Sequence, residues 1–443
     1  MTTDRYQSHV VAITKLGLPI VVAQLGVIVQ SFADTMMIGQ YGTPELSAAA
    51  FTNNVFNLVF FFLLGYSYST TPIVGYFYGK NDLHNVGKTL KESLFGNFVF
   101  SLIICLLLYI LYLNIEVLNQ PSELLPYIKP YFVLLLLSMP FVALFNSLKQ
   151  FSDAVGDTKT PMWVMILGNI LNIAGNSLLI FGLLGCPEWG LYGAGVATLL
   201  SRIVMCWLMF LAIHYKSRFK PYRQGFRSKI TFSGVWHLTR IGLPISCQLS
   251  LEAAAFNVGA IFMGWLGAYE LAAHQIACSI GTLCFTIYYG IGAAVAIRIS
   301  HFRGKHDWSE VRTTSAVGFV MTLCASTILS GAIFFSMRPL VSAFTPDVNV
   351  ANVVYSLMPA FFVYQFGDSL QVIFANSLRA IEKVRNLLLY AVIAYGCVSI
   401  PLSYFFAFPC RLGAPGVWWA FPFGLTTAGL LFCRKFYKET KRV

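Results

Sequence analysis

Apolar residues occur along this chain in long runs, separated by short segments rich in polar residues, glycine or proline. A membrane hydrocarbon core about 30 Å thick needs about 20 apolar residues per helix. Runs of that length predict membrane-spanning helices. We expect twelve of them, at residues 16–38, 47–72, 92–113, 127–148, 162–183, 190–214, 240–263, 271–297, 312–336, 352–376, 386–408 and 412–433.

The apolar pattern also repeats. When the sequence is shifted by 225 positions, Leu16–Ile20 falls on Ile241–Ile245, and the register then continues without a gap. Each half then holds six helices, an even number, so both halves have the same topology. Repeats of this kind are related by a pseudo-twofold axis along the membrane normal. The same register also pairs Gly39 with Gly264, Gly42 with Gly267, Glu45 with Glu270, Gly65 with Gly290, Gly79 with Gly304 and Asp82 with Asp307.

The repeat predicts an all-α integral membrane fold with two lobes and a central cleft. We expect an N-terminal six-helix lobe at 1–214, a basic cytoplasmic linker at 215–239, and a C-terminal six-helix lobe with a basic tail at 240–443. Repeated halves around a cleft are typical of transporters, because rocking of one half against the other exposes a midplane site to each side in turn.

Composition agrees with a membrane protein. Of the 443 residues, 57% are hydrophobic and 11% are charged, whereas soluble domains carry about 25% charged residues. The net charge of +12 reflects basic loops on one side of the membrane, so we do not expect nucleic acid as a partner. Only Lys129, Arg338 and Arg411 fall on the opposite side. This asymmetry predicts a multi-pass protein of the inner (cytoplasmic) membrane with both termini cytoplasmic; we expect a monomer surrounded by lipid.

Three acidic residues lie inside apolar runs: Asp34 in the first predicted helix, Glu252 in the seventh and Asp368 in the tenth. An ionised carboxylate there costs at least a few kcal/mol unless it meets water, a cation or a partner. Such a group can exchange a proton near neutral pH, or its oxygens can hold sodium. We therefore expect an ion-coupling function, with Glu252 and Asp368 as candidate sodium ligands.

The alternative is that these acids pair with buried bases and only join helices. Arg202 is the one basic residue that the pattern places deep in a predicted span. A single arginine cannot neutralise three acids in two halves, so we favour the functional interpretation.

Polar residues near these acids carry weaker signals. Asn169, Asn172 and Asn176 recur at helical spacing and share one helix face. Hydrogen bonding between helices explains each of them equally well. A minority of the aromatic residues, such as Tyr288 or Tyr289, could line the cleft and hold a flat cation. The candidate neighbours of the substrate or ion site are Tyr364, Gln275, Asn172, Asn176, Thr198, Gln30 and Asn54.

The sequence lacks the signatures of ATP binding and of zinc hydrolases that we sought, the Walker lysine loop and HExxH. We therefore expect neither an enzyme nor a bound cofactor. An ion gradient, of sodium or protons, would then supply the energy.

Several motifs resemble those of the multidrug and toxic compound extrusion (MATE) family. They are DTMMIG at 34–39, DAVGDTKTP at 153–161, GNILNIAGN at 168–176 and GAGVAT at 193–198. Their order and spacing cover essentially the whole chain. The resemblance implies twelve helices in two lobes and export of small organic cations, such as drugs and dyes, by antiport.

Within that family the chain is most similar to the NorM-type branch. Glu252 is matched there, as are AAHQI at 272–276, RISH at 298–301 and YQFGD at 364–368. The resemblance implies a cation site formed by Glu252 and Asp368 with Tyr364 nearby, and a second carboxylate site at Asp34. Asn176 stands where the archaeal DinF-type branch has a second aspartate.

The predicted function is multidrug efflux by exchange of organic cations for sodium ions or protons. A lipid-linked saccharide flippase of related architecture is the alternative, because fold does not fix function. Its anionic substrate would require basic residues in the cleft, whereas the deep charges here are mostly acidic. A membrane-embedded enzyme would need a nucleophile and base or a metal cluster, and a channel would not need the repeat.

Overall fold

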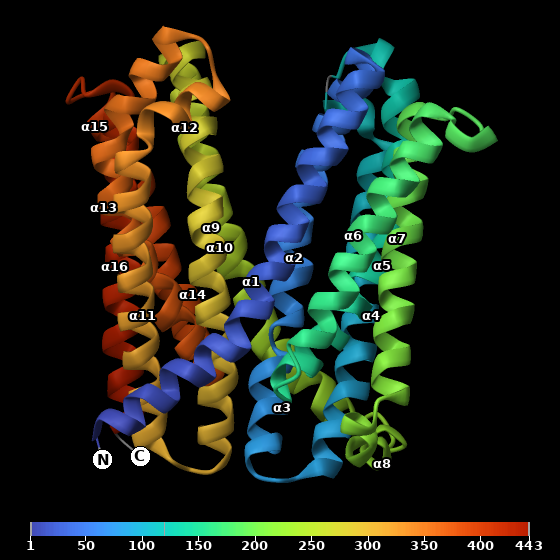
Figure 1. The fold of residues 1–443 in the computed structure, drawn as a ribbon, viewed down its shortest axis with the longest axis vertical. Helices are drawn as coiled ribbons and strands as arrows, with labels where there is room; N and C mark the ends of the chain where they lie inside the picture. The colour runs from blue at the N-terminus through green and yellow to red at the C-terminus, as the bar shows by residue number, and fades with distance from the viewer. Residues whose placement is uncertain (1, 119, 442–443) are drawn as a thin grey trace. The chain divides into compact units, whose positions relative to one another are not determined.

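The computed structural model describes residues 2–118 and 120–441, and those residues form helices, turns and loops with no β-strand. Twelve helical segments in this part of the chain are long and apolar enough to cross a membrane. The predicted all-α membrane fold with twelve spans is therefore confirmed. Figure 1 shows the helices coloured along the chain.

The first six spans occupy residues 4–215. The first is α1 (Thr2–Tyr41), and the second combines α2 (Thr43–Ser67) with α3 (Thr70–Gly79). The next four are α4 (Leu83–Leu113), α5 (Leu125–Ala154), α6 (Lys159–Phe181) and α7 (Gly190–Tyr215). Short 3₁₀ helices lie at Ile115–Leu118, Ser122–Leu124 and Leu183–Gly185, and the connection after α7 holds another at Ser217–Tyr222 followed by α8 (Arg223–Phe226).

The other six spans occupy residues 232–441. They begin with α9 (Phe232–Leu266), α10 (Ala268–Gly304) and α11 (Trp308–Phe335), and α12 (Met337–Phe344) precedes the long α13 (Val348–Ala380). The eleventh span joins α14 (Val384–Ala391), a π-helical segment at Val392–Ser399 and α15 (Ile400–Ala407). The chain then forms α16 (Gly413–Lys441).

Most of the helices extend beyond the predicted apolar runs. The tenth predicted helix ends at residue 376, whereas α13 continues to Ala380. Apolar residues mark only the part of a helix that lies in hydrocarbon, and its polar ends remain helical because they keep their backbone hydrogen bonds. This extension adds Arg379 to α13.

The chain divides into two compact units. One comprises residues 22–246, and the other combines residues 1–21 with 247–443. Helices α1 and α9 therefore each contribute to both units. These boundaries differ from those at 1–214, 215–239 and 240–443, which follow the sequence repeat; that division, the pseudo-twofold axis and the central cleft stay predictions.

The repeat is visible in local backbone structure. Asp82 caps the start of α4 by accepting a hydrogen bond from the Asn85 backbone N–H, and Asp307 caps α11 in the same way through Glu310. The residue before each cap, Asn81 or His306, has a positive φ of 60° or 58°. Equivalent positions thus form the same tight turn, because both halves need a sharp reversal that ends in a helix N-cap.

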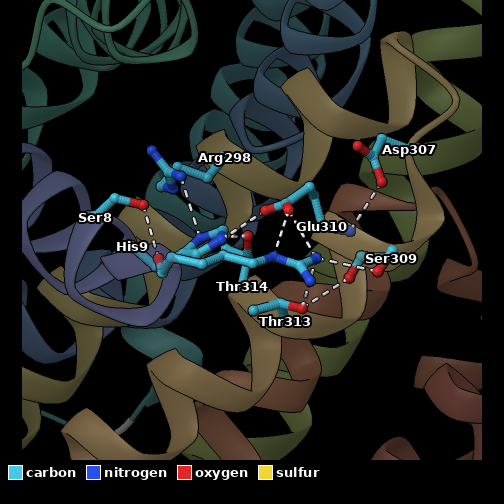
Figure 2. A network of polar contacts seen from close by, with 9 residues as sticks. Ser8, His9, Arg298, Asp307, Ser309, Glu310, Thr313 and Thr314 are labelled. Atoms are coloured by element: carbon cyan, nitrogen blue, oxygen red, sulfur yellow. Dashed lines mark hydrogen bonds and ion pairs between the residues drawn. The ribbon is translucent and has the colours of Figure 1, made fainter. Parts of the chain in front are cut away.

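A polar network joins the N-terminal segment of α1 to the unit that contains residues 247–443 (Figure 2). His9 is 1% exposed, and its Nδ1 lies 3.1 Å from Arg298 Nη2. A guanidinium can only donate, so the ring proton lies on Nε2, which donates to Glu310 Oε2 over 2.6 Å. Arg5 Nε donates to the other oxygen of Glu310 over 2.7 Å. The network joins α1 to α10 and α11, and it gives Arg298 of the RISH motif a structural contact.

Candidate functional site

Glu252 lies in the middle of α9 and accepts two hydrogen bonds on one carboxylate oxygen. Gln248 Nε2 donates to Oε2 over 2.9 Å, and Gln371 Nε2 on α13 donates to the same atom over 3.1 Å. Gln248 precedes Glu252 by one helical turn, so the two side chains share a face of α9. Neither glutamine was expected from the sequence.

Arg379 fixes the orientation of the first of these amides. Arg379 Nη2 donates to Gln248 Oε1 over 2.5 Å, and the side chain is 7% exposed. Because the amide oxygen accepts from the guanidinium, the amide nitrogen faces Glu252. The prediction that Arg202 is the only deep base was therefore wrong. It placed Arg379 in a loop, because the apolar run ends three residues before it.

Asp368 and Tyr364 lie one turn apart on α13 and are both buried, with exposures of 2% and 7%. Asp368 is close enough to Glu252 for their charges to interact. Its Oδ2 atom has no hydrogen-bond partner within the described part of the chain. A buried oxygen of this kind is costly unless it binds a proton or a cation.

Two further polar atoms near Glu252 also form no well-aligned hydrogen bond among the described residues, although the Tyr395 hydroxyl lies close to Glu252 and to Gln371. They are Gln371 Oε1 and the hydroxyl of Tyr395, which the π-helical segment carries. Gln371 follows Asp368 by three residues and lies on the same face of α13. π-Helical turns occur frequently at functional sites. The group therefore offers two carboxylates and neutral oxygen atoms, the ligands that hard cations prefer.

Aromatic rings pack beside this group. The Tyr364 ring centroid lies 6.1 Å from that of Phe256 and 6.1 Å from that of Trp418. Tyr288, in contrast, is fully buried, and its hydroxyl donates to Gln365 over 3.1 Å. The suggestion that Tyr288 lines a cleft was therefore wrong, because its ring is enclosed in the core of this unit.

Asp34 forms a second polar group, within residues 22–246. Asn176 Nδ2 on α6 donates to Asp34 Oδ1 over 2.6 Å. Asn176 also lies 3.4 Å from Asn172 Oδ1, and Asn172 donates to Thr198 Oγ1 on α7 over 3.3 Å. Gln30 lies one turn earlier in α1, close enough to interact with the carboxylate. The structure thus brings together four of the predicted neighbours around Asp34.

Arg202 lies within electrostatic range of Asp34. Its Nη1 atom donates to Ser138 on α5 over 2.5 Å, and its charge interacts with that of Asp34. Asn176 Oδ1 and Asn169 Nδ2 are buried without a hydrogen-bond partner among the described residues. The asparagine face of α6 therefore keeps unsatisfied polar atoms as well as bonds between helices.

Two of the predicted neighbours, Gln275 and Asn54, are exposed. The described hydrogen bonds do not join either side chain to Asp34, Glu252 or Asp368, so their part in a site stays a prediction. Groups of three or more histidine, cysteine, aspartate or glutamate residues that could hold a metal are absent from residues 2–118 and 120–441. Any cation site at Glu252 and Asp368 therefore relies on neutral oxygens for its other ligands.

Comparisons with known proteins show the family of this chain. The sequence profile described as MatE matches residues 19–178 and 244–405. A probable multidrug resistance protein NorM from Bradyrhizobium diazoefficiens is 30% identical over 95% of this chain and 91% of its own length. The multidrug resistance protein PmpM from Pseudomonas aeruginosa is 27% identical over 99% of this chain and 93% of its own.

Solved structures share the fold at lower sequence identity. The eukaryotic MATE transporter AtDTX14 superposes with a TM-score of 0.88 at 17% identity, over 99% of this chain and 98% of that one. A MOP superfamily transporter from Pyrococcus furiosus, reported to have a binding pocket of reverse polarity, gives 0.85 at 18% identity over 97% and 95%. The family and its NorM-type branch, predicted from sequence motifs, are thereby confirmed: the chain belongs to the MatE family.

Proposed function

We propose that this protein is a multidrug efflux antiporter that exports organic cations in exchange for sodium ions or protons. Its relatives carry the names NorM and PmpM and are called multidrug resistance proteins. We also propose that it lies in the cytoplasmic membrane with both termini on the cytoplasmic side, as the basic loops suggest.

The observation that carries this proposal is the buried carboxylate of Asp368, which lies within electrostatic range of Glu252 and whose Oδ2 atom has no hydrogen-bond partner in the described part of the chain. Two ionised carboxylates that lie near each other repel until a proton or a cation neutralises their charge. The neutral oxygens of Gln371 and Tyr395 could complete a sodium site. Proton uptake by either carboxylate satisfies the same requirement, so the arrangement supports either coupling ion.

Charge competition links this ion to export. A cationic drug and the coupling ion are both stabilised by the same negative charges, so binding of one lowers the affinity for the other. An ion entering from outside would neutralise the carboxylates and release the drug outward. Asp34 would act as a second participant, because Asn176 and Gln30 stabilise its charged form until an ion or substrate binds.

The alternative is a lipid-linked saccharide flippase. An anionic pyrophosphate would need cations that are available to it. Arg202 and Arg379 donate to Ser138 and Gln248, and each also lies within electrostatic range of a carboxylate, Asp34 or Glu252, which offsets its charge toward an anionic substrate. This favours a cationic substrate. Competition of dye export by other organic cations, and its absence with anionic saccharide lipids, would distinguish the two functions.

Everted membrane vesicles test the proposal. In the proposed orientation, export appears as dye accumulation inside such vesicles when an ion gradient is applied. We expect Glu252→Gln and Asp368→Asn each to abolish gradient-driven accumulation. An amide side chain neither takes up a proton near neutral pH nor offers sodium a negatively charged ligand.

The matched control is Glu123→Gln, which changes an exposed acid in the same conservative way. It should accumulate dye as the unchanged protein does. Equal amounts of folded protein in the membrane, measured by size-exclusion chromatography after extraction, would make the comparison valid. Full activity in both site variants would refute the coupling role of Glu252 and Asp368.

A further inference from the structure

A hollow opens at the start of α6 and the end of α7, away from the three acids. It has a volume of about 500 Å³ and is lined by Asp157, Lys159, Thr160, Trp163, Lys216, Ser217 and Arg218. Three of these seven residues are basic and one is acidic. The volume lies within the range of small-molecule sites, about 300–1,000 Å³.

The acid belongs to the wall of the hollow and is already satisfied by neighbouring groups. Asp157 is 9% exposed, and its Oδ2 atom accepts from Thr160 Oγ1 over 2.6 Å. Its other oxygen accepts from the Thr160 backbone N–H over 3.3 Å. Both carboxylate oxygens of Asp157 therefore accept hydrogen bonds from the first turn of α6.

The basic side chains are positioned by the same wall but keep free donor capacity. Lys216 Nζ donates to Thr160 Oγ1 over 2.5 Å, and Arg218 Nη2 donates to the Val155 carbonyl over 3.2 Å. An ammonium has three N–H donors and a guanidinium five. Each group therefore has further donors for an anion, and Lys159 at the first turn of α6 is exposed.

An apolar stripe leads away from the hollow along α6. Trp163, Leu167, Ile170 and Leu171 are 64%, 44%, 57% and 42% exposed, and their spacing places them on one face of the helix. In a membrane-spanning helix an exposed apolar face lies against lipid chains. An exposed tryptophan next to basic residues is typical of the membrane–water interface.

From this juxtaposition we propose that the hollow binds the phosphate headgroup of an anionic membrane lipid. The phosphate would lie between Lys159, Lys216 and Arg218, and one acyl chain would run along the stripe that starts at Trp163. Basic pockets between membrane helices on the cytoplasmic side bind anionic headgroups in this way. Free phosphate shares the headgroup chemistry but would make no use of the stripe.

Native mass spectrometry of the full-length protein can test this site. The protein is released from nanodiscs made of equal parts phosphatidylglycerol and phosphatidylcholine, and the retained lipids are identified. We expect preferential retention of phosphatidylglycerol. We expect each basic residue in contact with the headgroup to strengthen binding about fivefold, so Lys159→Ala with Lys216→Ala should weaken retention about 25-fold.

Three controls make the result decisive. Lys220→Ala removes an exposed lysine from the same connection, outside the hollow, and should retain the lipid. Lys216→Arg keeps the charge and should also retain it. If the double variant does not fold, Lys159→Ala alone should still show the fivefold loss.

Equal retention of phosphatidylglycerol by the unchanged protein and the lysine variants would overturn the proposal. Inorganic phosphate, added as a competitor, distinguishes the two sources of the anion. Retention of lipid in its presence supports the headgroup site. Binding of phosphate with no preference between the two lipids would overturn it in favour of a free-anion site.

Discussion

At the scale of residues, two successive hydrogen bonds connect Arg379 to the carboxylate of Glu252. Arg379 donates to Gln248, and Gln248 donates to Glu252. Hydrogen bonds and a nearby positive charge stabilise the ionised carboxylate. Burial opposes the charge of Glu252, and Arg379 opposes that effect; we therefore expect Arg379 to act as a positioning residue that favours the charged form and so release of the ion.

Arg379→Gln tests this role at the residue scale. Glutamine keeps a donor for Gln248 but removes the positive charge, so the empty carboxylate becomes less stable and holds its ion more tightly. We expect the ion concentration for half-maximal dye export to fall about tenfold. Lys305→Gln, which removes an exposed charge at the end of α10, should leave that concentration unchanged. A higher ion requirement in Arg379→Gln would contradict the assigned role.

The three acids could be predicted from sequence, but most of their partners could not. A carboxylate stands out in an apolar run because burial of its charge is expensive. Gln248, Gln371 and Tyr395 do not stand out, because amides and hydroxyls occur in many helices and only three-dimensional packing brings them to Glu252. The asparagine face of α6 could also be predicted from the sequence, because three asparagines recur at helical spacing.

At the scale of elements, both halves contain a helix whose start is capped by an aspartate. Partial burial of Asp82 opposes its ionisation, but the hydrogen bonds from Asn85 outweigh it, so the pKa of Asp82 lies below its ordinary value. The carboxylate cap is then complete above the unfolded pKa, about 3.9. It is lost only as the pH falls through the lower folded value.

Hydrogen exchange at the start of α4 tests this cap. Loss of a capping carboxylate costs about 1 kcal/mol, so we expect Asp82→Ala to speed amide exchange of Asn85 and Val86 about fivefold at neutral pH. Asp82→Asn should exchange almost as slowly as the unchanged protein, because an asparagine side chain also accepts from the helix start. Unchanged exchange in Asp82→Ala would show that the cap does not hold this end.

Helix number could be predicted because apolar runs follow the membrane thickness, but helix ends and irregular turns could not. The π-helical segment at Val392–Ser399 lies within one continuous apolar run. Its extra residue per turn changes hydrogen bonding without changing hydrophobicity, so the pattern contains no sign of it. Tyr395 lies on that segment, which is a further reason why this residue was missed.

At the scale of the whole molecule, the repeat and the comparisons agree on a twelve-helix transporter of the MatE family. The sequence repeat does not reveal that α1 and α9 each belong to two compact units, because helix membership depends on packing. A helix shared between units is a mechanical connection.

The central claim is that ion and drug move in opposite directions in an obligatory exchange. Its most direct test uses proteoliposomes that contain the purified full-length protein, with the membrane potential clamped at zero. An outward gradient of a cationic dye is imposed without any ion gradient. The internal sodium concentration and pH are then recorded separately.

The proposed mechanism predicts that dye efflux drives sodium or protons into the liposomes although no ion gradient was imposed. Glu252→Gln and Asp368→Asn should each abolish this ion movement. The ion that moves would identify the coupling ion. Dye efflux with neither sodium nor proton movement, in protein that is folded and active, would contradict the exchange mechanism.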